Sequence, residues 1–228
     1  MLPLRLIRPQ IDLSPDLVEQ VRTLLLDAMC DGTLVPGTRL RQEELAEWFD
    51  VSRQPVLQAL HLLKRDGFVT DSGRRGLMVA PLDSAMIVRI YEVRSVLDGL
   101  AARLAAGHAC EIDCNLIYDG RKAASGKSLH RMIDADMAFH HALYDASGND
   151  FIAESAESHW MHIRRAMGAV LQETGTRSTV WDEHEAILDA VQRGQVARAE
   201  RLARAHGAEA GGKLAARLDK LAKLAKSA

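Results

Sequence analysis

Residues 44–69 read ELAEWFDVSRQPVLQALHLLKRDGFV, and this stretch decides the fold of the first part of the chain. The apolar spacing predicts a short helix over 42–49, followed by a tight turn at Asp50 and Val51. Ser52 can then cap a second helix. The inward positions of that helix are Val56, Ala59, Leu60 and Leu63. Two short helices joined by such a turn predict a helix-turn-helix.

The sequence on either side of this stretch predicts a winged helix. Before it, SPD at 14–16 is a helix-start signal, and apolar residues then recur at helical spacing. After it, two short alternating runs predict a hairpin over 68–79 with Arg74 and Arg75 at its tip. Such a tip is either an ordinary solvated turn or a loop that contacts DNA. Because it follows a candidate recognition helix, the second interpretation is favoured.

Composition narrows the class of protein. The chain has 228 residues, with 29 Lys plus Arg against 31 Asp plus Glu, so the net charge of −2 gives no polybasic signature. No apolar run approaches the length of a membrane span, and the start MLPLRLIRPQ lacks the apolar core of a signal peptide. Three cysteines are too few for a disulfide framework. We therefore expect a cytoplasmic protein with no membrane contact.

The amino-acid composition and the apolar spacing change near Pro81. Five of the six prolines precede it, and from Ser84 onward the chain has no proline and shows apolar spacings of three and four. The expected fold is therefore mainly α: a winged helix-turn-helix over 1–82 and an all-α helical bundle over 83–228.

Four polar side chains interrupt the apolar stripes of the helices predicted in the second part. They are Asp136, His140, His184 and His206. A histidine on an apolar face is commonly a hydrogen-bonded core residue, but the i, i+4 spacing of Asp136 and His140 lets both bind one ion. One carboxylate with three imidazoles suits zinc, nickel or manganese, so we expect a divalent metal, with zinc first.

Arg94 lies on the apolar stripe of the first helix of this part. A buried arginine needs an anion. The sequence leaves two partners open: a structural ion pair with Asp98 or Glu92, or a bound anionic ligand.

The first part of the chain resembles the amino-terminal domain of GntR-family bacterial transcription regulators. The resemblance rests on the segments PGTRL, ELAEWFDVSRQPVLQALHLLKRDGFV and RRGLMV. It implies that Arg53 reads a guanine in the major groove, that Ser52 holds phosphate and that Gln54 can pair with adenine. It also implies that Arg74 and Arg75 approach the minor groove or the DNA backbone.

Two residues depart from the family pattern. Leu57 stands where the family usually has arginine, which removes a cation from the DNA face and predicts weaker phosphate binding or a contact with a thymine methyl. Asp50 stands where the family usually has glycine in the turn. Because aspartate tolerates a left-handed backbone, we expect the turn to be kept.

The second part resembles the FCD effector-binding domain of the FadR-type branch of these regulators. The segments that carry this resemblance are YEVRSVLDGLAARLAA, Asp136-x-x-Phe139-His140, Glu183-His184 and His206. It implies a metal held by Asp136, His140, His184 and His206. It further implies that Arg94 and an open metal position receive the carboxylate of a small organic acid. The spacing of His159 and His162 on the helix after Asn149 leaves two interpretations open: histidines that face solvent or pack, or histidines that reach the same cavity, and we name His162 as the candidate for the second.

The leading hypothesis is a transcription regulator, and repression is the more common direction of regulation. A homodimer would place two recognition helices on an inverted repeat in double-stranded DNA, under the control of the bound acid. The alternative is a metal-dependent enzyme, a hydrolase or oxygenase that uses the Asp and three His. A complete DNA-binding module and the absence of an obvious general base argue against the enzyme. A metal that only stabilises the bundle is compatible with regulation.

Overall fold

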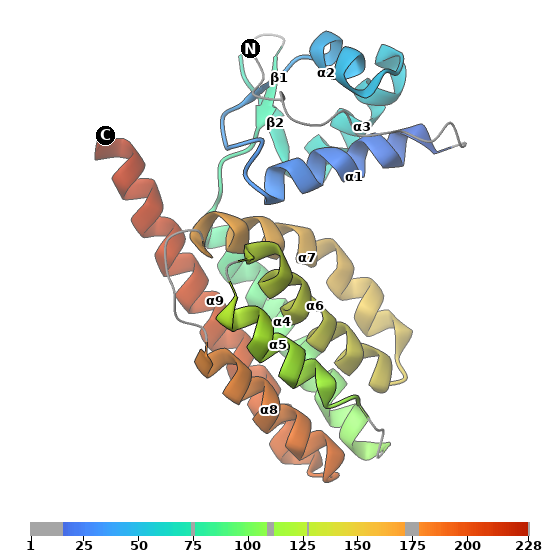
Figure 1. Ribbon diagram of the computed structural model, residues 1–228, viewed down its shortest axis with the longest axis vertical. Helices are drawn as coiled ribbons and strands as arrows, with labels where there is room; N and C mark the ends of the chain where they lie inside the picture. The colour runs from blue at the N-terminus through green and yellow to red at the C-terminus, as the bar shows by residue number, and fades with distance from the viewer. Residues whose placement is uncertain (1–15, 74–75, 109–111, 127, 172–177, 228) are drawn as a thin grey trace. The chain divides into compact units, whose positions relative to one another are not determined.

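The computed structural model describes residues 16–73, 76–108, 112–126, 128–171 and 178–227 (Figure 1). The chain divides into two compact units, Met1–Leu82 and Asp83–Ala228. No described helix combines the length and the apolar character that a membrane span requires.

The first unit is a helical core with a small sheet. Its elements are α1 (Leu17–Cys30), β1 (Arg39–Leu40), α2 (Gln42–Phe49), α3 (Arg53–Arg65), β2 (Val69–Asp71) and β3 (Leu77–Val79). The sheet has the order β1-β3-β2, and both pairings are antiparallel. Met78 at the centre of β3 lies opposite Arg39 on one side and Thr70 on the other. The helix-turn-helix and the hairpin pairing are confirmed, whereas β1 was not predicted.

The turn between α2 and α3 has the conformation that the sequence predicts. Asp50 has φ 57° and ψ 44°, and its amide donates to the carbonyls of Ala46 and Glu47. Among the described residues it is the one non-glycine with positive φ. The left-handed conformation costs aspartate less than most residues, so the chain forms the turn without a glycine at this position.

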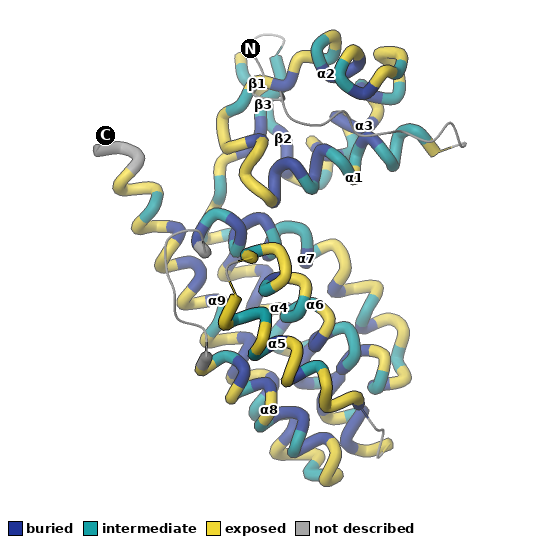
Figure 2. Tube along the Cα trace, viewed as in Figure 1, coloured by how far each residue is buried: buried dark blue, intermediate teal, exposed yellow. Residues whose placement is uncertain are grey.

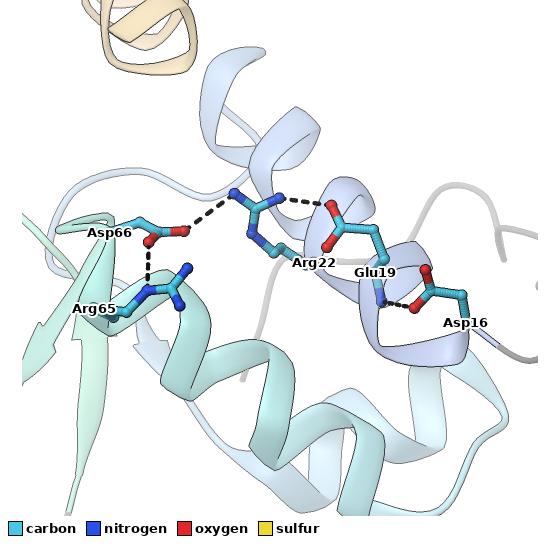
Figure 3. A network of polar contacts seen from close by, with 5 residues as sticks. All are labelled: Asp16, Glu19, Arg22, Arg65 and Asp66. Carbon is cyan, nitrogen blue, oxygen red and sulfur yellow. Dashed lines mark hydrogen bonds and ion pairs between the residues drawn. The ribbon is translucent and has the colours of Figure 1, made fainter. Parts of the chain in front are cut away.

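Helix α1 begins later than expected. Asp16, not Ser14, is the N-cap, and its carboxylate accepts from the amide of Glu19 at 3.2 Å. Ser14 and Pro15 lie outside the described residues. On the same helix Arg22 joins Glu19 at 2.6 Å to Asp66 at 3.1 Å (Figure 3). Because Asp66 caps the end of α3, this contact fixes α1 against the helix that carries the candidate DNA-reading side chains.

The second unit is helical throughout its described elements. They are α4 (Ser84–Gly107), α5 (Asn115–Ser125), α6 (Leu129–Ala146), α7 (Asp150–Leu171), α8 (Ser178–Gln192) and α9 (Val196–Ser227). In Figure 2 these helices carry buried positions on one side and exposed positions on the other. Trp160 and Tyr144 are the largest of its described side chains that are fully buried.

Helices α4 and α9 pack closely because glycines line their contact. A Cβ at Gly207 would lie 3.1 Å from Ser95, and a Cβ at Gly211 would lie 2.5 Å from the Cβ of Tyr91. As the numbers rise along α9 they fall along α4, so the two helices run antiparallel. Close packing by glycine brings α9 within reach of the polar residues of α4.

Candidate functional site

The four side chains that the sequence singled out converge in the second unit. Asp136 and His140 come from α6, His184 from α8 and His206 from α9. The three histidines are buried and Asp136 is half-buried. His184 Nε2 lies 3.1 Å from His206 Nε2 and 3.7 Å from Asp136 Oδ1. One ring nitrogen from each histidine falls within 4.8 Å of the other two.

These residues fit a metal ion. Zinc holds imidazole nitrogens at about 2.0–2.1 Å, so tetrahedral ligand nitrogens stand roughly 3.3 Å from one another. The 3.1 Å between His184 Nε2 and His206 Nε2 is close to that spacing. Both ring nitrogens of His140 and Nδ1 of His184 are buried without a hydrogen-bond partner in the described structure. Buried polar atoms usually have a hydrogen-bond partner or a ligand. A cation between the three histidines would satisfy the His140 nitrogen that faces it.

Burial also favours the protonation state that a metal requires. It lowers the pKa of His184 well below its usual value, and the neighbouring His140 and His206 lower it further. Burial lowers the pKa of His140 as well, with the charge of Arg94 acting in the same direction. Both imidazoles are therefore neutral at pH 7 and keep a lone pair for coordination.

Neighbouring side chains orient the histidines. His206 Nδ1 lies 2.7 Å from Glu183 Oε2, so Nδ1–H donates to the carboxylate and Nε2 is left facing His184. His140 Nδ1 lies 3.6 Å from Asp98 Oδ2, which leaves its Nε2 for the metal. The ring of His184 is stacked on Phe139 with centroids 4.1 Å apart. The sequence reasoning missed the role of Glu183, although this residue stands directly before His184.

Arg94 forms the structural ion pair that the sequence left as one alternative. Its Nε lies 3.5 Å from Asp98 Oδ2 with both side chains buried, whereas Glu92 is exposed. Asp98 Oδ1 also accepts from the hydroxyl of Tyr144 at 2.5 Å, and the Arg94 guanidinium lies 3.9 Å from the ring centroid of Trp160. Burial raises the pKa of Asp98, but the charges of Arg94 and His140 outweigh it and bring the pKa to about 2. The pair is therefore ionised at neutral pH.

A cavity of about 220 Å³ opens beside these residues. Its polar lining includes Arg94, Asp136, His140, Glu183 and His206. Arg94 thus faces both Asp98 and the cavity. His162, which was expected to reach the cavity, is half-buried on α7 and is not among the described residues that line it.

The candidate DNA-binding residues lie at the start of α3 in the first unit. Ser52, Arg53 and Gln54 are all exposed. Ser52 occupies the N-cap position, but its hydroxyl makes no capping bond and is available to a phosphate. Arg53 Nη1 lies 3.2 Å from Glu43 Oε1 of α2, with both side chains mostly exposed. The other predicted contacts, Arg74 and Arg75, lie outside the described residues.

Two segments of the chain match known protein families. Residues 17–79 match the family described as bacterial regulatory proteins, gntR family. Residues 89–209 match the FCD domain. The first segment contains the helix-turn-helix and the sheet, and the second contains all four candidate metal ligands.

Individual proteins are similar over most of the chain. The HTH-type transcriptional regulator LutR of Bacillus subtilis (strain 168) is 32% identical in an alignment of 204 residues that covers 77% of this chain and 91% of LutR. The HTH-type transcriptional repressor RspR of Escherichia coli (strain K12) is 26% identical over 141 residues, 60% of this chain and 62% of RspR. The solved structure of E. coli McbR/YncC shares the fold, with a TM-score of 0.71 at 21% identity over 91% of this chain and 99% of that one. These relatives are regulators by name, which removes the support for the metal-dependent enzyme.

Proposed function

The chain belongs to the GntR family of bacterial regulatory proteins and carries an FCD domain, so it is a DNA-binding transcriptional regulator, and we propose that a small carboxylic acid bound at a divalent metal controls its operator binding. The metal would be held by Asp136, His140, His184 and His206. The acid would occupy the adjoining cavity with its carboxylate toward the metal and Arg94. A regulator needs no chemical step at this site, only a ligand whose affinity differs between two states of the protein.

The convergence of four ligand groups from three helices at a cavity that also contains Arg94 carries this proposal. A metal bound there supplies positive charge and an open coordination position. Three imidazoles with one carboxylate suit zinc first, and nickel or manganese as alternatives. Glu183 and Asp98 lie beside the imidazoles of His206 and His140, and apolar side chains line part of the cavity next to them.

In the first unit, we propose that Arg53 reads a base, that Ser52 contacts phosphate and that Gln54 contributes a second base contact. Arg74 and Arg75, which lie between β2 and β3 in the sequence, complete the proposed interface. A homodimer would bind an inverted repeat, since two recognition helices related by a two-fold axis read palindromic half-sites. We propose that the protein represses transcription, and its relative RspR is a repressor by name.

Elemental analysis of the purified protein tests the metal site. About one divalent ion per chain is expected for the wild type, and a loss of most of it for His140→Ala/His184→Ala. The matched control is His130→Ala/His141→Ala, which removes two histidines of α6 outside the cavity lining and should keep the metal. A full metal complement in His140→Ala/His184→Ala would refute the assignment.

Operator binding is tested with a sequence selected from random double-stranded DNA. Arg53→Ala should abolish the gel shift on that sequence while leaving the circular dichroism spectrum and thermal transition unchanged, because the Arg53 side chain is 70% exposed. Acids are then screened for release of the DNA from metal-loaded protein. Unchanged DNA binding by Arg53→Ala would overturn the proposed interface, and no release by any acid would overturn the proposed control.

A further inference from the structure

We infer that the ligand is a short aliphatic dicarboxylate, bound with one carboxylate at the metal end of the cavity and the other between Lys213 and Arg217 at its outer end. The inference rests on the function proposed above, because it concerns the same cavity. It assigns the chemical class of the acid and two residues that select it.

The cavity extends along α9, from His206 at one end to Arg217 at the other. From this helix the lining residues are His206, Gly207, Ala210, Lys213, Leu214 and Arg217. At a rise of 1.5 Å per residue, Lys213 lies about 10 Å and Arg217 about 16 Å along the axis from His206. The other helices follow the same order. On α6 Met132 lies one turn beyond Asp136, and on α8 Thr179 lies about one turn beyond Glu183.

The two ends of the cavity differ in charge. The carboxylates among its described lining residues, Asp136 and Glu183, lie at the metal end. The outer end has Lys213 and Arg217. Lys213 forms an ion pair with Glu209 at 2.6 Å and also interacts electrostatically with Glu183, whereas Arg217 forms no ion pair with any described residue. This leaves the outer end with a net positive charge.

The first turn of α8 adds to this positive charge. The helix begins at Ser178, and Thr179 and Val180 line the cavity. The amides of a helix N-terminus carry partial positive charge and favour an anion. Two cationic side chains and one helix start therefore surround the outer end, which is the environment that a second carboxylate needs.

The walls between the two ends are mostly apolar. They are formed by Met132, Met167, Trp181, Ala210 and Leu214, and Tyr91, which packs beside Gly211, is the lining residue between the ends that carries a hydroxyl. A sugar acid would bury several hydroxyl groups against a wall with few hydrogen-bond partners, which is costly. An aliphatic chain buries there at no such cost. The volume of about 220 Å³ is below the range of drug-sized sites and fits a small molecule.

The length of the acid follows from the spacing along α9. Helical side chains lean toward the N-terminus, so the ammonium of Lys213 is carried back toward His206. A lysine that reaches about 6 Å in that direction leaves roughly 4 Å of the 10 Å axial separation, and the His206 ring, which leans the same way, adds to that remainder. Four to six carbons separate two carboxyl carbons by roughly 4–6 Å in an extended chain. Succinate, glutarate and adipate span this range.

Isothermal titration of the metal-loaded, full-length protein tests the inference. The probes are succinate, glutarate and adipate, each paired with the monocarboxylate of equal length (butyrate, valerate, hexanoate), together with gluconate. The variant is Lys213→Gln/Arg217→Gln. The matched control is Arg201→Gln/Lys220→Gln, which removes two exposed cations of α9 outside the cavity lining.

We expect at least one dicarboxylate to bind the wild type and the control about tenfold or more tightly than its monocarboxylate partner, a difference of about 1.4 kcal/mol. In Lys213→Gln/Arg217→Gln that preference should fall below about threefold, with binding of the monocarboxylate unchanged. Equal binding of the two classes by the wild type would overturn this inference and leave the proposed function standing, as would a preference that survives in the variant or tightest binding by gluconate. Binding of no acid at all would overturn both.

Discussion

Gly211 and Gly212 are neighbours on α9 with opposite surroundings, and replacing each by alanine should change stability in opposite directions. A Cβ at Gly211 would lie 2.5 Å from Cβ and 2.6 Å from Cγ of Tyr91, which is buried on α4. A Cβ at Gly212 would meet nothing within 4 Å. The pair therefore separates helix propensity from packing at adjacent positions of one helix.

The magnitude follows from two opposing contributions. Alanine in place of glycine inside a helix stabilises by up to about 1 kcal/mol, and both variants gain this. Gly211→Ala must in addition displace Tyr91, and forcing extra volume into a packed interface costs about 1–3 kcal/mol. Gly212→Ala should thus be slightly more stable than the wild type. The free energy of unfolding of Gly211→Ala should be about 1–3 kcal/mol lower than that of Gly212→Ala.

Scanning calorimetry of the full chain measures this difference on the transition of the second unit. For a unit of this size, 2 kcal/mol corresponds to a Tm difference of roughly 4–8 °C. Because Tyr91 lines the cavity, Gly211→Ala should also weaken acid binding, whereas Gly212→Ala should leave it unchanged. Equal Tm values for the two alanine variants would refute the reasoning, since they would mean that Tyr91 gives way without cost and that α4 and α9 are not in tight contact.

Three further predictions concern charged side chains. Glu183→Gln should weaken metal binding about 10–100-fold in competition with a chelator, because it loses the charged partner of a ligating histidine; an unchanged affinity would contradict this. Glu43→Gln should tighten operator binding about 1.4–5-fold by anisotropy, since an exposed ion pair of about 0.2–1 kcal/mol no longer competes for Arg53; an equal gain in Glu47→Gln would show a general charge effect instead. The pKa of Asp98 is lowered from 3.8 to about 2, so this group stabilises the fold above pH 4 and the contribution is lost as the pH falls toward 2. In metal-free protein, the excess stability of wild type over Asp98→Asn should therefore shrink by roughly 2 kcal/mol between pH 5 and 2, as measured by urea unfolding, and a constant difference would exclude this role.

Local patterns predicted the parts of the structure that depend on nearby residues. The helix over 42–49 and the i, i+4 placement of Asp136 and His140 follow from spacing along one helix, and both are present. The strand β1 could not be predicted in this way, because two residues become a strand only through pairing with β3.

Contacts between helices were likewise out of reach of the sequence pattern. Glu183 and His206 are separated by 23 positions, and their contact depends on how α8 packs against α9. The hydroxyl of Ser52 was expected to cap α3, and the position is correct but the hydrogen bond is not made. The pattern thus gave the face on which a side chain lies and left its partner undetermined.

The two partners that the sequence left open for Arg94 are compatible in the structure. A guanidinium has five N–H donors, and the closest approach of Asp98 is to Nε. Asp98 is in turn held by Tyr144 and lies near His140, so it does not depend on Arg94 alone. An incoming carboxylate can therefore bind the cavity side of Arg94 while the buried ion pair persists.

The same arrangement couples the proposed metal to the proposed acid. Oδ2 of Asp98 lies 3.5 Å from Arg94 Nε and 3.6 Å from His140 Nδ1, so a cation on His140 and an anion on Arg94 act on the same carboxylate oxygen. A metal adds positive charge beside Arg94 and strengthens the attraction for an acid. Since coupling between two binding sites is reciprocal, the acid must tighten the metal by the same factor that the metal tightens the acid. Chelator competition with and without succinate would measure that factor directly.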